Sequence, residues 1–111
     1  MDIKTMRTCR KAIETYGEVH QITKALEEMS ELSKELLKLL CEVEAGRKFG
    51  FPPNLNPVLA DHIAEEMADV MIMVTQLEMI FRNTGDVRRW IDRKIERLAN
   101  DIAKKESERS D

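Results

Sequence analysis

The chain has 111 residues, the size of one domain, and its hydrophobic fraction of 42% is enough for a modest buried core. Charged residues make up 35% and the formal net charge is −3, so the basic excess of a nucleic-acid-binding domain is missing. With four glycines and three prolines, the composition excludes collagen-like and disordered classes and favours long helices. No apolar run reaches the roughly 18 residues of a membrane span. We therefore expect neither nucleic acid nor membrane as a partner.

The N-terminus and the cysteines indicate a compartment. The opening sequence MDIKTMRTCRK lacks the apolar centre of a signal peptide. Cys9 and Cys41 stand alone, without the spacing of a zinc site or a disulfide framework. Because isolated thiols are usual in reducing compartments, we expect a cytoplasmic protein.

Four segments are predicted to be helices in a single all-α domain that spans residues 1–111. Gly17, Gly46 and Gly85 are expected to separate them, and Asn56 and Asp86 to cap the third and fourth. The segment GRKFGFPPNLNP is rich in glycine and proline and is predicted to be a loop, and the tail ESERSD to be frayed. The expected helices cover residues 3–16, 18–45, 57–83 and 86–105.

Apolar residues recur at helical spacing in the last three of these segments, and each set falls on one side of its helix. Such stripes on successive helices predict a four-helix bundle-like protomer. The third helix carries further apolar residues outside its main stripe, namely Met71, Ile72 and Met79. This extra apolar surface predicts self-association.

Four acidic residues interrupt the pattern. With Ile63 as zero, Glu66 lies at about 300°, inside the apolar arc of the third helix, and Asp69 lies at about 240°, on its edge. On the second helix, Glu28 lies at about 240° from Ile22, on the border of that apolar arc, and Glu31 near 180°. Carboxylates that face a core are costly unless they are paired or bind a metal. Ordinary solvated helix faces are the alternative explanation.

Oxygen ligands of this kind suit Mg²⁺, or Mn²⁺ in its place. The two pairs lie on successive helices, so an antiparallel arrangement would bring them together. Placing Glu28 opposite Glu66 requires an axial offset of about 12 Å between the helix ends, which the twelve-residue loop allows.

The surrounding motifs resemble a known family. Glu27-Glu28-Met29-Ser30-Glu31 and Glu65-Glu66-Met67-Ala68-Asp69 look like the EExxE and ExxD motifs of the MazG-like nucleotide pyrophosphohydrolases, within the all-α NTP pyrophosphatase superfamily. The resemblance covers roughly residues 12 to 100. It implies hydrolysis of a nucleoside triphosphate to a monophosphate and pyrophosphate by a homodimer or homotetramer. Glu27 and Glu65 match the acids that flank the ligands, and both are expected to face solvent.

The resemblance also implies site residues. Glu31 is our choice for the acid that takes the proton of the attacking water, because it lies furthest from the apolar arc. Gln21 has two interpretations, a contact with a base edge or a bridge to a neighbouring side chain. The basic residues expected to meet phosphates are Lys24, Lys94 and Arg97, and those expected to hold Mg²⁺ are Glu28, Glu31, Glu66 and Asp69.

Other interpretations stay open. Phosphoribosyl-ATP pyrophosphohydrolase shares the acidic helices, although the SYT-type segment usual in that family is missing. A non-catalytic helical oligomerisation module is the alternative of a different class. Lys24 has an alternative as an ion-pair partner of its acidic neighbours, and Lys94 and Arg97 as a solvated helix face. His62 is expected to be a boundary residue, with contact to substrate or to a metal ligand as the alternative. Glu35 is expected at the surface, with a role as a spare acid as the alternative. Phe49 and Phe51 are expected to plug the bundle end, with the cover of a nucleobase as the alternative.

Overall fold

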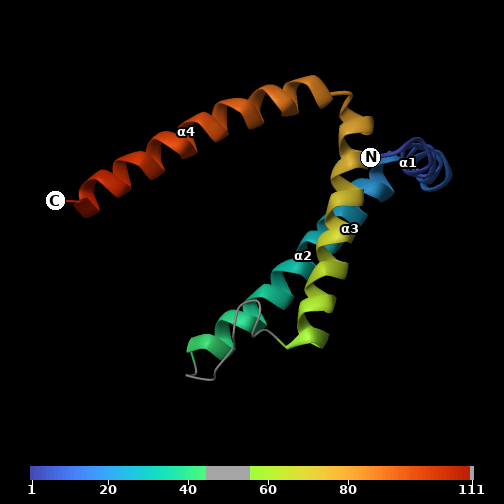
Figure 1. Ribbon diagram of the computed structural model, residues 1–111. Helices are drawn as coiled ribbons and strands as arrows, with labels where there is room; N and C mark the ends of the chain where they lie inside the picture. The colour runs from blue at the N-terminus through green and yellow to red at the C-terminus, as the bar shows by residue number, and fades with distance from the viewer. Residues whose placement is uncertain (45–55, 111) are drawn as a thin grey trace. The chain divides into compact units, whose positions relative to one another are not determined.

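The computed structural model describes residues 1–44 and 56–110, with the backbone alone for residues 42–44 and 110. Its helices are α1 (Ile3–Tyr16), α2 (Glu18–Glu44), α3 (Pro57–Phe81) and α4 (Thr84–Ser110), and no strand occurs in these ranges (Figure 1). The predicted all-α, bundle-like fold is confirmed. The chain divides into two compact units, residues 1–80 with α1, α2 and α3, and residues 81–111 with α4.

The ends of α1 follow the predicted signals. The Asp2 side chain accepts a hydrogen bond of 2.7 Å from the backbone N–H of Thr5 and so caps the first turn. Gly17 ends the helix with φ 92°, a left-handed value that an L side chain rarely adopts, and its N–H donates to the carbonyl of Ile13. α2 begins at the next residue.

The prediction for the start of the fourth helix was wrong. Arg82, with φ 52°, terminates α3, and the carbonyl of Asn83 accepts the hydrogen bond from Val87 that begins α4. Gly85 and Asp86 therefore lie inside the first turn, where an acid stabilises the positive end of the helix without being the cap. The tail predicted to be frayed is helical to Ser110, which fits the helix propensity of its Glu and Arg residues.

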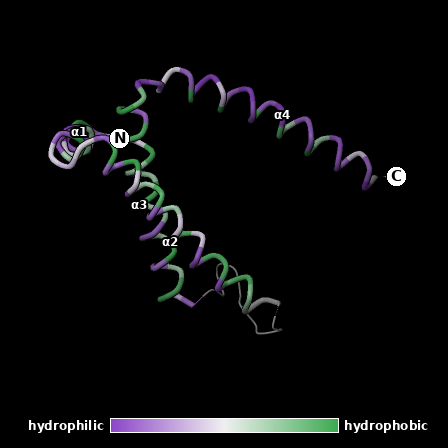
Figure 2. The backbone as a smooth tube through the Cα atoms, turned by 180° about the vertical axis from the view of Figure 1, so that it is seen from behind, coloured by the Kyte–Doolittle hydropathy of each residue, from purple (hydrophilic) through white to green (hydrophobic). Residues whose placement is uncertain are grey.

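α2 and α3 run antiparallel and pack side by side (Figures 1 and 2). Gln21 of α2 donates a hydrogen bond of 2.7 Å to Gln76 of α3, and Glu35 lies 3.4 Å from His62. Glu35 follows Gln21 by fourteen residues in α2, and His62 precedes Gln76 by fourteen residues in α3. The two contacts therefore belong to the same register between the antiparallel helices. Halfway between them this register places Glu28 opposite Asp69. The offset between the helix ends is about 6 Å, not the 12 Å expected for Glu28 opposite Glu66.

The core of the first unit is small. Among the residues whose side chains are described, the buried apolar ones are Cys9, Ala25, Leu39 and Met73. Many large apolar side chains of α2 and α3 keep 40% or more of their surface, among them Leu26, Leu36, Leu37, Leu40, Met67 and Met71. None of the described helices combines the length and apolar character needed to cross a lipid bilayer.

Gln21 and Gln76 are buried at 5% and 4% exposure, so their amide hydrogen bond is shielded from water. Of the two interpretations of Gln21, the structure shows the bridge. His20 Nδ1 lies 2.7 Å from the side-chain oxygen Oε1 of Gln21 and provides a second partner.

We expect Gln21→Leu and Gln76→Leu each to lower the free energy of unfolding by about 1–3 kcal/mol, because each leaves a buried amide without its partner. The double variant should lose less than the sum of the two, since neither amide then remains unpaired. Urea denaturation of all four proteins measures this cycle. Additive losses would show that the two amides do not interact.

Candidate metal centre

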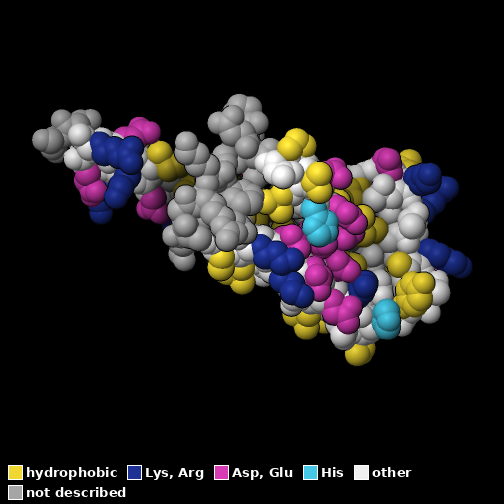
Figure 3. All heavy atoms as spheres, turned by 90° about the horizontal axis from the view of Figure 1, so that it is seen from below, with side chains coloured by type: hydrophobic (Ala, Val, Ile, Leu, Met, Phe, Trp, Pro, Cys, Tyr) yellow, Lys and Arg dark blue, Asp and Glu magenta, His cyan; other side chains and the backbone are white. Residues whose placement is uncertain are grey.

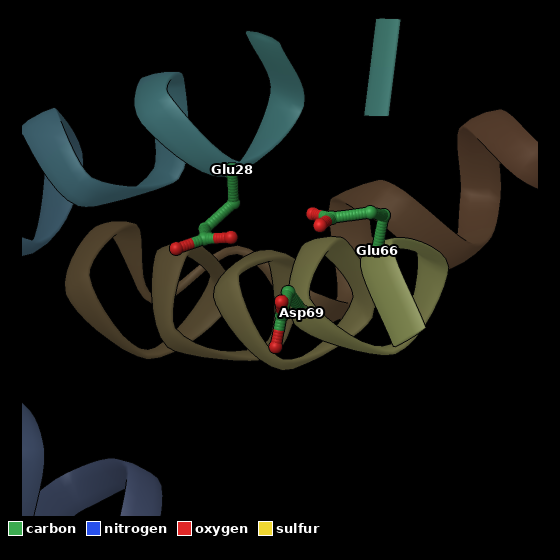
Figure 4. A group of neighbouring side chains, drawn as sticks. All are labelled: Glu28, Glu66 and Asp69. Atoms are coloured by element: carbon green, nitrogen blue, oxygen red, sulfur yellow. The ribbon is translucent and has the colours of Figure 1, made fainter. Parts of the chain in front are cut away.

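Three carboxylates from two helices meet on the α2–α3 face. Glu28 reaches from α2 toward Glu66 and Asp69, which lie one turn apart on α3 (Figure 4). Each of the three offers one oxygen, and these oxygens lie within 4.8 Å of one another. All three residues are half-buried. The structure therefore brings together three of the four metal ligands that the sequence suggested.

Both α3 acids hold their charge at a cost. Partial burial raises the pKa of Glu66 above its ordinary value, and the charges of Asp69, Glu28 and Glu31 raise it further. Burial is also the first cause of the raised pKa of Asp69, followed by the charge of Glu28. His62 and Lys24 oppose these shifts only in part. The cluster thus keeps a negative potential that its neighbours compensate only in part and that a cation would relieve.

Glu31, the fourth suggested ligand, lies outside this group. It follows Glu28 by one turn on α2 and is exposed, yet its charge is near enough to raise the pKa of Glu66. Glu27 and Glu65 are exposed, as expected.

Lys24 lies beside the cluster. Its ammonium is 3.1 Å from Glu28 and 3.6 Å from Glu27. The hydrogen bond with Glu28 is the main cause of the raised pKa of Lys24, so the side chain stays fully charged at neutral pH. The ion-pair alternative for Lys24 is thus what the structure shows. Because the Lys24 side chain is 46% exposed, it remains accessible to an anion that approaches the acids.

Glu35 was expected at the surface, and this prediction was wrong. The residue is only 6% exposed and accepts a hydrogen bond of 3.2 Å from Lys38, which is the first cause of its lowered pKa. His62 Nδ1 lies 3.4 Å from the other Glu35 oxygen, and His62 Nε2 lies 3.8 Å from Glu66. His62 is exposed, and its two ring nitrogens lie between the buried Glu35 carboxylate and Glu66 of the cluster.

Figure 3 shows acidic side chains gathered on one face around a histidine, with basic side chains at the border of the patch. Lys94 and Arg97 belong to α4, in the other unit, and their part in a site stays a prediction. The loop residues Phe49 and Phe51 lie outside the described residues. Comparisons with protein families, with curated proteins and with solved structures find no match for this chain.

Proposed function

We propose that the protein is a Mg²⁺-dependent nucleoside triphosphate pyrophosphohydrolase of the cytoplasm, which cleaves an NTP or dNTP to the monophosphate and pyrophosphate. The observation that supports it most is the convergence of Glu28, Glu66 and Asp69 across α2 and α3. The same three residues belong to the two motifs that resemble the MazG-like enzymes.

The donor set fits the proposed ion. All three groups are carboxylates, which are hard oxygen ligands, and no cysteine is among them. The raised pKa values of Glu66 and Asp69 indicate that these groups gain from a positive charge at this place. Bound Mg²⁺ would neutralise the triphosphate and polarise its phosphorus–oxygen bonds.

The other residues have roles that follow from their places. Glu31 is exposed one turn after Glu28, so it is available to accept a proton from a water molecule at the rim of the cluster. Lys24 is a charged donor beside the same carboxylates and would bind a phosphate oxygen. Glu35 and Lys38 hold His62 next to Glu66, which limits the positions that the Glu66 carboxylate can take.

Two other functions remain as alternatives. Phosphoribosyl-ATP pyrophosphohydrolase would use the same acids on a different substrate. A non-catalytic helical module is favoured by the exposed apolar side chains of α2 and α3, which offer surface for self-association.

The direct test is pyrophosphate release from a panel of NTPs, dNTPs and phosphoribosyl-ATP with Mg²⁺, with Mn²⁺ and with chelator. We expect metal-dependent turnover of at least one nucleoside triphosphate and background release with chelator. Turnover of phosphoribosyl-ATP alone would select the first alternative. No turnover together with no Mg²⁺-dependent nucleotide binding would select the helical module.

A further inference from the structure

Hydrophobic residues recur along α4 between hydrophilic ones (Figure 2), and four of them form an apolar seam. The seam residues follow one another at steps of four, three and four residues, which is the a/d spacing of a coiled coil. Each of them exposes between 50% and 59% of its surface. The set is Ile91, Ile95, Leu98 and Ile102.

Basic residues limit the seam at both ends. Arg88 and Lys105 occupy the next seam positions before Ile91 and after Ile102. Two α4 helices in antiparallel orientation bury all four apolar residues of each only when Ile91 faces Ile102 of the other helix. A shift by one heptad would put the Arg88 guanidinium against an apolar residue. In the parallel and in the antiparallel pair alike, each of these end cations lies opposite another cation. Arg88 and Lys105 therefore set the register of the two helices but not their relative direction.

Flanking charges decide the direction. With Ile95 at position a, Lys94 and Asp101 both fall at position g. Antiparallel helices bring g next to g, so Lys94 of each copy meets Asp101 of the other, twice by symmetry. Parallel helices bring g next to the following e, which would put Asp101 beside Glu106 of the other copy, two like charges. The charge pattern therefore favours the antiparallel pair.

The two charges are not used within their own helix. Lys94 and Asp101 are seven residues apart, about 10.5 Å along the helix axis, which is too far for an ion pair. Neither forms an ion pair with any residue that the structure describes. Both are available to a partner.

We propose that α4 pairs antiparallel with α4 of a second copy of this chain, through the apolar seam and two Lys94–Asp101 ion pairs. The proposal names the helix, its direction and its contacts, beyond the homodimer or homotetramer that the family resemblance implies. It is independent of nucleotide hydrolysis. It gives Lys94 a role different from the phosphate contact suggested by the sequence.

Charge exchange tests the proposal in the full-length protein. Lys94→Asp and Asp101→Lys should each weaken dimerisation at least about 10-fold in sedimentation equilibrium over a concentration series, because two attractive pairs become repulsive. The double variant Lys94→Asp/Asp101→Lys should recover the dimer. An equimolar mixture of the two single variants should also recover it, since every pair in the mixed dimer is again of opposite charge. Circular dichroism checks that each variant keeps its helix content.

Recovery by mixing separates this pairing from others. If α4 instead covers its seam with helices of its own chain, any self-association uses other surfaces and does not respond to the exchanges at Lys94 and Asp101, and the proposal is overturned. Single variants that dimerise like the wild-type protein overturn it as well. So does a mixture that stays dissociated, because Lys94 and Asp101 would then not face each other.

Discussion

Glu66→Gln is expected to reduce metal-dependent turnover at least about 100-fold while leaving the fold intact. Loss of residues that only support a metal ligand typically costs 10–100-fold in metal affinity or activity, and Glu66 is itself one of the three clustered carboxylates. The glutamine keeps the shape of the side chain but removes the negative charge. The measurement is pyrophosphate release as a function of Mg²⁺ concentration on the best substrate of the panel.

The same change should not lower the melting temperature of the metal-free protein and should raise it slightly. In the wild-type protein the Glu66 charge is partly desolvated and repelled by Asp69, Glu28 and Glu31, and only His62 opposes this. Removing that charge relieves the native state. Asp61→Asn is the matched control, because it makes the same acid-to-amide change at an exposed position of the same helix. Full activity in Glu66→Gln, or equal losses in both variants, would contradict the proposed centre.

The sequence predicts the helices well because their signals are local. Gly17 needs only its own left-handed backbone to end α1, and apolar periodicity is visible in each helix alone. The break after α3 was misplaced because Arg82, not a glycine, takes the left-handed conformation. Nothing in the chemistry of an arginine indicates this, whereas Gly85 gives a strong signal that the helix overrides.

The site was predicted in part, since it depends on the register between two helices. Gln21, Glu28 and Glu35 recur every seven residues on α2, and His62, Asp69 and Gln76 recur every seven residues on α3. Each set turns by only about 20° per step, so both form one polar line along the interface. The seven-residue spacing could have indicated that Glu35 and Gln76 make contacts across the α2–α3 interface, which were not predicted from the sequence. The expected offset placed Glu28 opposite Glu66, and no single helix reveals that the true partner is Asp69.

Mg²⁺ is expected to stabilise the protein, and this stabilisation should fade as the pH falls. At about 100 times its dissociation constant, a ligand that binds only the native state adds about 2.7 kcal/mol, which for a domain of this size raises the melting temperature by on the order of 10 °C. Thermal unfolding with and without Mg²⁺ measures the difference. NaCl of equal ionic strength is the control, because general screening of the acidic patch would stabilise without specific binding.

The two raised pKa values determine how the stabilisation by Mg²⁺ changes with pH. Glu66 and Asp69 hold protons more tightly in the folded protein than in the unfolded chain. Above the raised pKa values, the charges of Glu66 and Asp69 lower the free energy of unfolding by their full amount. This loss of stability disappears as the pH falls through the raised pKa values toward the ordinary carboxyl range. Protons then replace Mg²⁺, so the gap between metal-bound and metal-free melting temperatures should narrow as the pH is lowered from neutral toward the ordinary carboxyl range.

The Glu35 charge stabilises the folded protein, and this stabilisation is lost in a lower pH range. Its pKa is lowered, so its favourable contribution is complete above the ordinary carboxyl range and is lost only as the pH falls below that range, through the lowered value. This loss affects the protein with and without Mg²⁺ alike and cancels in the difference between the two melting temperatures. Glu66→Gln should reduce that difference at every pH. A gap of equal size at both ends of the pH range, or one that NaCl reproduces, would mean that the carboxylates do not form a divalent-cation site.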